Sequence, residues 1–324
     1  MISSILKQAV CSGHLSKKRD RFQDYHEYKS LEERFQMVTQ IEGLNGIEIV
    51  HPYVANDATE LKDLIQKYKV DVSAINANIK QETEFMNGGI TSPEKKVREK
   101  AIQFIKNAKK FAQETGVNKV TCCPLSDGYE FSFNCNYLQK WKYLIDGFGE
   151  ASEFLPEIPL FIEYKPNESR GRCFLDTASK TLLLLKEIGS KSMGVTIDFG
   201  HSLYGNENPA EALSLVVEND FPFYIHINDN DGKWDWDWMV GTKHLLDYIE
   251  FIFYLQEYNY KDFITSDTSP TRWDIKESLE INTRLTNKIW SLLENIDREK
   301  FKKLISSDNF IKIWDFIENK IIKI

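Results

Sequence analysis

The chain has 324 residues, of which 42% are apolar and 28% charged, and 49 acidic residues against 41 basic ones give a net charge of −8. This composition is typical of a globular protein large enough to bury a core, and its acidic balance argues against a nucleic-acid-binding surface. No run of about 18 apolar residues predicts a membrane span, and residues 1–12 lack the basic and apolar regions of a signal peptide. The five cysteines fit neither a zinc motif nor a disulfide framework, so we expect reduced thiols and a cytoplasmic location.

Short apolar runs alternate with longer amphipathic stretches along most of the chain. The apolar runs, which we predict to be strands, lie at Ile5–Cys11, Ile47–Val50, Val70–Ile75, Val117–Thr121, Pro159–Ile162, Met193–Ile197, Phe221–Ile225 and Phe263–Thr265. Helical spacing of apolar residues occurs at Leu31–Ile41, Ala58–Lys67, Pro93–Glu114, Asn136–Phe154, Asp176–Ile188, Pro209–Glu218, Thr242–Glu257 and Ile275–Leu293. Alternating strands and helices predict parallel strands joined by crossovers.

Eight such units favour an α/β fold closed into a (β/α)8 TIM barrel, and we expect this catalytic barrel to span residues 1–296. An open doubly wound sheet would often carry a GxGxxG phosphate turn, which the sequence lacks. Residues 297–324 keep a helical spacing and predict extra C-terminal helices that pack on the barrel or on a subunit partner. We expect a homo-oligomer, either a dimer or a tetramer.

Polar residues follow five of the predicted strands, at the end of the barrel where catalytic groups gather. These strand-end residues are His51, Glu163, Asp198, His226 and Asp267. Further candidates are His201, three residues after Asp198, and the loop residues Asp235 and Asp237. Each residue alone is compatible with a turn, a helix cap or a buried histidine, but together they bring five carboxylates to one rim.

These carboxylates need a counter-charge, because two of them 4 Å apart repel by about 4 kcal/mol at an effective dielectric near 20. Two divalent cations together with Lys165 would balance the five negative charges. Oxygen ligands with a few imidazoles favour Mn²⁺, Mg²⁺ or Co²⁺ over a structural zinc ion. The sequence therefore predicts about two divalent metal ions per chain.

The segment Ile162–Gly171, IEYKPNESRG, resembles a segment of the xylose isomerase family and its relative L-rhamnose isomerase, Glu-Pro-Lys-Pro-Asn-Glu-Pro-Arg-Gly. The resemblance implies one metal held by Glu163, Asp198, His226 and Asp267, and a second that shares Asp198 and adds His201, Asp235 and Asp237. It implies a metal-assisted hydride shift between C1 and C2 of an open-chain sugar. Lys165 would then hydrogen-bond the carbonyl oxygen, and His51 would assist ring opening. Ala55 stands where xylose isomerase has an aspartate that orients this histidine.

Three further residues are candidates for contacts with the substrate or with the ligands. Glu168 could serve as an acid in an epimerase, and Asp229 is expected to orient His226 or Lys233. Arg21 could lie near an anionic group of an acidic or phosphorylated sugar, although a solvated loop is the favoured interpretation.

Aldose–ketose isomerisation is the function that these residues favour, with a small-molecule sugar as partner and neither nucleic acid nor membrane. A ketose 3-epimerase on the same fold is the first alternative, with one metal and a pair of glutamates for proton transfer. Asp267 and the Asp235–Asp237 pair favour the isomerase. A multi-zinc endonuclease for abasic DNA is disfavoured by the net charge, and a non-catalytic sugar-binding protein by the intact ligand set.

Overall fold

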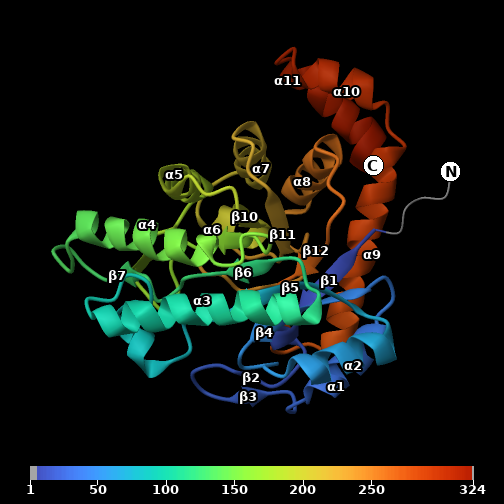
Figure 1. Ribbon diagram of the computed structural model, residues 1–324. Coiled ribbons are helices and arrows are strands. Elements are labelled where there is room, and N and C mark those ends of the chain that lie inside the picture. The colour runs from blue at the N-terminus through green and yellow to red at the C-terminus, as the bar shows by residue number, and fades with distance from the viewer. Residues whose placement is uncertain (1–5, 323–324) are drawn as a thin grey trace.

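The computed structural model describes residues 6–322, in which eight parallel strands close into a barrel (Figure 1). Around the barrel the strands follow the order β1-β12-β11-β10-β8-β6-β5-β4. Their bounds are β1 (Gln8–Cys11), β4 (Gly46–His51), β5 (Asp71–Ala77), β6 (Val120–Cys122), β8 (Leu160–Glu163), β10 (Met193–Asp198), β11 (Phe223–Ile227) and β12 (Ile264–Ser266). The predicted TIM barrel is thereby confirmed, and Ile5 of the first predicted strand lies outside the described residues.

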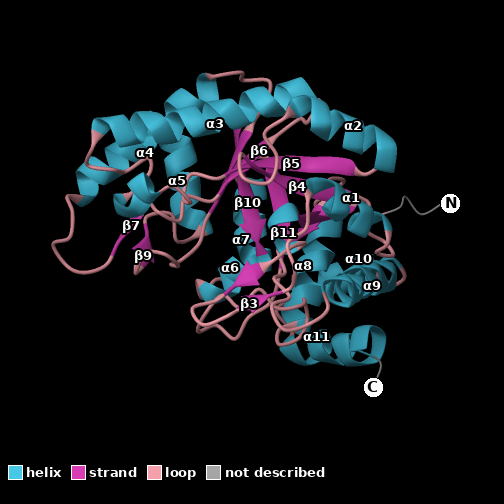
Figure 2. Cartoon of the chain, turned by 90° about the horizontal axis from the view of Figure 1, so that it is seen from below, coloured by secondary structure: helices cyan, strands magenta, loops and turns pink. Residues whose placement is uncertain are grey.

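Helices surround the strands on the outside (Figure 2). They are α1 (Leu31–Thr39), α2 (Ala58–Tyr68), α3 (Lys95–Thr115), α4 (Tyr137–Glu153), α5 (Ala178–Ile188), α6 (Phe199–Tyr204), α7 (Pro209–Glu218), α8 (Leu245–Glu257) and α9 (Ile275–Glu294). Side chains at the start of a helix often satisfy its free N–H groups. Asp57 does so for α2 by accepting hydrogen bonds from the backbone N–H groups of Thr59 and Glu60.

Aromatic side chains fill the barrel interior near the amino ends of the strands. Phe161 and Phe263 belong to a buried cluster there with Ala9, Ala74 and Tyr224. Their rings occupy the space beside two glycines, because a Cβ on Gly46 would lie 2.5 Å from Phe263 and one on Gly194 would lie 2.6 Å from Phe161. This packed layer closes one end of the barrel and leaves the carboxyl end available for a site.

Short elements connect the strands and helices. They are β2 (Lys18–Arg19) paired with β3 (Asp24–Tyr25), β7 (Gly128–Tyr129) paired with β9 (Arg172–Cys173), and the 3₁₀ turns η1 (Ser12–His14) and η2 (Thr83–Asn87). No helix among residues 6–322 is both long enough and apolar enough to cross a membrane.

The C-terminal helices α10 (Arg298–Ile305) and α11 (Phe310–Phe316) continue into the π-helical turn η3 (Ile317–Ile322) and lie beside α8 and α9 (Figure 1). Phe301 packs edge-on against Phe253 of α8 at 5.3 Å and stacks on Phe316 at 4.7 Å between ring centroids. The predicted extra helices are therefore present and contact the barrel. The division at residue 296 and the expected oligomer stay predictions.

Candidate active site

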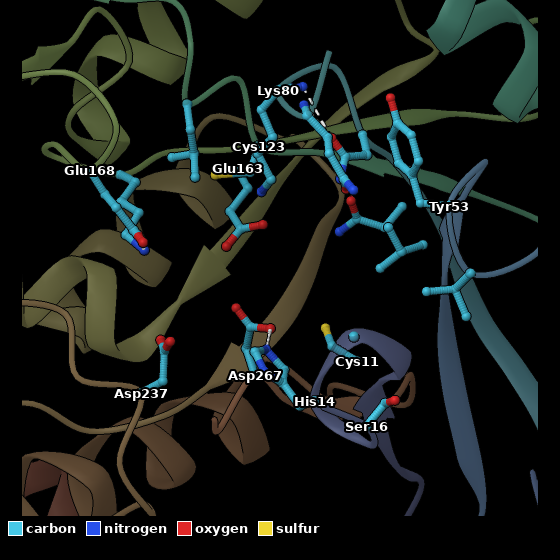
Figure 3. Close-up of a pocket in the computed structure, with 18 of the residues that line it drawn as sticks. Cys11, His14, Ser16, Tyr53, Lys80, Cys123, Glu163, Glu168, Asp237 and Asp267 are labelled. Carbon is cyan, nitrogen blue, oxygen red and sulfur yellow. Dashed lines mark hydrogen bonds and ion pairs between the residues drawn. The ribbon is translucent and has the colours of Figure 1, made fainter. Parts of the chain in front are cut away.

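A cavity of about 660 Å³ opens at the carboxyl ends of the strands (Figure 3). Half of the predicted site residues line it, namely Glu163, Lys165, Glu168, His201, Asp237 and Asp267. Glu163 and Asp198 are the last residues of β8 and β10, and Asp267 directly follows β12. His226 of β11 lies in register with Asp198, and the Asp267 N–H donates to the Ile227 carbonyl at 3.0 Å. Backbone pairing of neighbouring strands thus brings these four side chains together.

Two overlapping groups among residues 6–322 bring possible metal-ligand atoms within 4.8 Å of one another. One consists of Glu163, Asp198, His201 and Asp267, and the other of Cys11, His226 and Asp267. His226 Nδ1 also lies 3.5 Å from Glu163 Oε1, so it borders the first group. The structure therefore holds one candidate metal site rather than two separate ones.

Glu48 fixes the orientation of His226 from the opposite side of the ring. The two side chains lie 2.8 Å apart between Nε2 and Glu48 Oε2, and both are completely buried. In the neutral ring Nε2 carries the hydrogen that the carboxylate accepts, so the lone pair of Nδ1 faces the site. His226 Nδ1 is buried without a hydrogen-bond partner among the described atoms, which is the arrangement of a metal-ligating histidine.

Asp198 is held in place by the backbone and by a neighbouring amide. It caps α6 by accepting a hydrogen bond from the His201 N–H at 2.8 Å. Asn228 Nδ2 donates to both Asp198 carboxylate oxygens, at 3.0 and 2.9 Å. Gly200 makes room for this amide, since a Cβ there would lie 1.7 Å from Asn228 Oδ1.

Asp235 is paired with positive groups of the protein. Lys165 Nζ lies 2.7 Å from its Oδ2, and His201 Nε2 lies 3.0 Å from the same atom. Lys165 also contacts Glu168, and both line the cavity. Asp237 lines the cavity as well but belongs to neither metal-ligand group. Of the two carboxylates expected at a second metal, Asp235 is therefore paired with protein side chains, and Asp237 lies outside both candidate ligand groups.

A relay of two side chains orients Asp267. His14 Nε2 lies 2.7 Å from Asp267 Oδ1, and Lys18 Nζ lies 2.5 Å from His14 Nδ1. An ammonium group only donates, so Nδ1 accepts and the hydrogen on Nε2 points to Asp267. Burial raises the pKa of Asp267, but His14 and His226 together lower it by more, so this carboxyl group stays ionised.

The pKa shifts show how strongly the cluster attracts positive charge. Burial raises the pKa of Glu163, but His226 and His201 together outweigh burial and lower this pKa to about 2. Burial lowers the pKa of His226, but Glu48 and Glu163 raise it well above its ordinary value. Burial also lowers the pKa of His201, but Asp198 and other carboxylates raise it well above its ordinary value. A cluster that raises histidine pKa values in this way meets the electrostatic requirement of a cation site.

Comparison with known proteins places the chain in a family. The family model described as "Xylose isomerase-like TIM barrel" matches residues 35–285. The chain belongs to the xylose isomerase-like TIM barrel family.

Solved structures share the fold of this family member at low sequence identity. A D-tagatose 3-epimerase-like protein is 22% identical, with a TM-score of 0.70 over 88% of this chain and 98% of the other. An L-ribulose 3-epimerase is 16% identical, with a TM-score of 0.72 over 94% and 99%. The IOLI protein, solved with a zinc atom, is 15% identical, with a TM-score of 0.67 over 90% and 100%. At these identities the likeness shows the fold alone.

The residues of this xylose isomerase-like barrel fit a divalent cation. The site combines carboxylate oxygens with imidazole nitrogens, a ligand set suited to Mn²⁺, Co²⁺ or Zn²⁺. The free, buried Nδ1 of His226 supplies an observation independent of charge. Cys11 fits less well, because burial and the neighbouring Asp267 raise its pKa well above the ordinary value and keep it a thiol.

Three predicted residues are not brought to the cavity. His51 ends β4 but packs against Phe111 of α3, with ring centroids 4.7 Å apart, on the outer face of the strand. Arg21 is exposed and lies over its neighbour Phe22. Asp229 accepts hydrogen bonds from the backbone of residues 243 and 244 and contacts the His244 ring, so it orders the start of α8 instead of orienting His226 or Lys233.

Sequence reasoning missed several residues that shape the site. Glu48 stood inside an apolar run, and a charged residue in a buried strand is the signal that could have revealed it. Asn228 follows a strand directly, as the predicted ligands do. His14, Lys18 and Cys11 reach the site from the first strand and its loop, and no motif marks them.

Proposed function

We propose that the protein is a divalent-metal-dependent ketose 3-epimerase. The observation that carries this proposal is the pairing of Asp235 with Lys165 and His201, which leaves one carboxylate–histidine cluster for one metal. Similarity to two proteins named as 3-epimerase or 3-epimerase-like supports the same choice.

Glu163, Asp198, His201, His226 and Asp267 are the residues that would hold or border the cation. A bound divalent cation would supply positive charge that stabilises negative charge on the sugar oxygens. Glu163 and Asp267 point toward one another in the cavity, with carboxylate oxygens within 4.8 Å (Figure 3), which suits a two-base exchange. One carboxylate would take the proton from the carbon beside the ketose carbonyl, and the opposite face would receive a solvent proton passed on by the other carboxylate. The sugar gains and loses one proton, so only its configuration changes.

Aldose–ketose isomerisation is the second candidate function. Lys165, from the segment that resembles the xylose isomerase family, lines the cavity with its side chain 7% exposed. This placement favours a role for its ammonium group at a sugar oxygen. The same lysine is compatible with epimerisation, in which it would stabilise negative charge on that oxygen.

A single NMR experiment separates the two reactions. Ketoses and aldoses are incubated with the Mn²⁺-loaded protein in D₂O, and the carbon-bound protons are followed. Epimerisation places solvent deuterium at C3, whereas a hydride shift moves hydrogen between C1 and C2 without exchange. Transfer between C1 and C2 alone would overturn the epimerase proposal.

Metal stoichiometry gives an independent test. We expect one ion per chain by elemental analysis, and we expect Asp235→Asn to keep it because Asp235 is paired with Lys165. Glu163→Gln should lose the ion, since Glu163 belongs to the ligand cluster. Two ions in the parent protein and one in Asp235→Asn would instead support the two-metal isomerase.

A further inference from the structure

The cavity has two chemically different sides. Its carboxylates, Glu163, Glu168, Asp237 and Asp267, come from the second half of the chain. Four side chains with permanent positive charge also line it, namely Lys17, Arg34, Lys80 and Lys165. In Figure 3 Lys80 lies beyond Glu163, on the side away from Asp237 and Asp267.

Two of these four cations already have carboxylate partners. Lys17 lies 2.9 Å from Asp24, and Lys165 lies 2.7 Å from Asp235. For Lys80 and Arg34, in contrast, no carboxylate of residues 6–322 lies within 4.0 Å of a charged nitrogen. These two residues are therefore the charges in the cavity lining that a bound anion could pair with.

The backbone holds Lys80 in a defined position at the carboxyl end of β5. The Asn78 side chain accepts hydrogen bonds from the N–H groups of Lys80 and Gln81, both at 3.1 Å. Asn78 N–H in turn donates to the His51 carbonyl at 3.0 Å. Desolvation lowers the pKa of Lys80, but Cys123, Glu163 and Glu168 together raise it above its ordinary value, so the side chain stays charged.

Arg34 is the second cation without a carboxylate partner, and it is 93% buried, with 7% of its surface exposed. Its Nε donates to the Lys29 carbonyl at 3.0 Å and its Nη1 to the Ser12 carbonyl at 2.8 Å. Its guanidinium carbon lies 5.9 Å from the Tyr28 ring centroid, and Tyr28 also lines the cavity. Two neutral carbonyls leave the full positive charge of Arg34 at the cavity wall, although burying an uncompensated charge is costly.

We propose that the substrate is a sugar with an anionic group, a carboxylate or a phosphate, and that Lys80 recognises this group on the side of Glu163 away from Asp237 and Asp267. Arg34 is the second unpaired cation of the same cavity lining. The proposal rests on the proposed sugar-modifying function and adds the substrate class. Arg34 pairs well with planar carboxylates and with phosphates, and lysine with either as a point charge.

A matched set of ketoses tests the proposal, because D-fructose, D-fructuronate and D-fructose 6-phosphate differ only at C6. Binding to the Mn²⁺-loaded protein is measured by calorimetry, and turnover by the deuterium experiment. We expect at least one anionic ketose to bind about tenfold more tightly than fructose, as one charge-assisted hydrogen bond allows. The two anionic arms distinguish a carboxylate from a phosphate.

Lys80→Met is the decisive variant, and Lys17→Met is its matched control at a lysine that Asp24 already neutralises. We expect Lys80→Met to remove the anionic preference, with less than a twofold change for fructose, and Lys17→Met to keep the preference. Equal binding of neutral and anionic ketoses by the parent protein, or an unchanged preference in Lys80→Met, would overturn the proposal. Anion-selective binding without turnover of any sugar would support the anion site and reject the epimerase function.

Discussion

At the scale of single residues, the contact between His226 and Glu48 determines which ring nitrogen faces the site. Glu48 also accepts hydrogen bonds from Asn76 at 2.9 Å and Thr121 at 2.7 Å, so its carboxylate is fixed by three strands. Hydrogen-bond partners of this kind typically contribute 10- to 100-fold to metal affinity.

We expect Glu48→Gln to weaken metal binding by about 10- to 100-fold without unfolding the barrel. The amide has the same shape but cannot stabilise the imidazole as a carboxylate does. A competition titration with a chelating dye measures the change in Kd. Glu32→Gln is the control, because Glu32 pairs with Lys67 on the surface. An unchanged Kd in Glu48→Gln would contradict this role.

The positions of the proposed ligands could be predicted where these residues end a strand, but not where a side chain reaches the site from another part of the chain. Glu163, Asp198 and Asp267 stand at strand ends, and parallel pairing gathers strand ends at one rim. His51 also ends a strand, yet its side chain points outward to α3. Alternation along a strand decides which side faces the barrel, and a shift of one residue reverses it. Apolar residues on both faces hide that alternation.

At the scale of elements, the long strands and helices could be predicted because their apolar periodicity is sustained. The paired segments β2 with β3 and β7 with β9 could not, because two residues carry no period. Helix α6 was also missed, since its six residues directly follow Asp198 at the end of β10. These short elements depend on tertiary contacts more than on local pattern.

The junction between α6 and α7 contains a carboxyl group that makes stability depend on pH. Glu207 is half-buried and accepts a hydrogen bond from the Ala178 N–H at the start of α5. Burial raises its pKa from 4.5 to about 7, with Asp176 and Glu211 acting in the same direction. Because the folded-state pKa lies above the unfolded one, its contribution is fully present below about pH 4.5 and is lost as the pH rises through 7.

We expect the free energy of unfolding to fall by about 1–2 kcal/mol from this group between pH 4.5 and pH 8, after allowance for solvent screening. Urea unfolding at several pH values, with EDTA present to remove metal effects, measures the fall. Glu207→Gln should show a correspondingly flatter profile. Identical profiles for the two proteins would show that Glu207 does not cause the dependence.

At the scale of the whole molecule, a ligand cluster drawn from four strands should couple metal binding to folding. A metal that binds only the folded chain at one hundred times its Kd stabilises it by about 2.7 kcal/mol. For a chain of this size that corresponds to a rise in Tm of roughly 5 °C.

We expect EDTA to lower the Tm of the parent protein and Mn²⁺ to restore it. Differential scanning calorimetry measures the two transitions. In Glu163→Gln, which lacks one member of the cluster, EDTA and Mn²⁺ should have little effect. Equal responses of the parent protein and the variant would mean that the metal binds elsewhere.

The positions of the site residues along the chain also bear on how such a barrel can diverge. The members of the proposed metal cluster fall between residues 163 and 267, whereas Arg34 and Lys80 lie in the first third of the sequence. Recombination near residue 150 would therefore exchange the proposed anion-recognising wall and leave the reaction centre intact. Glu48 and His14 are the exceptions, because they belong to the first half but support His226 and Asp267 in the second. Two half-barrels from different proteins would therefore form a working site only if the first half supplied these contacts to the second.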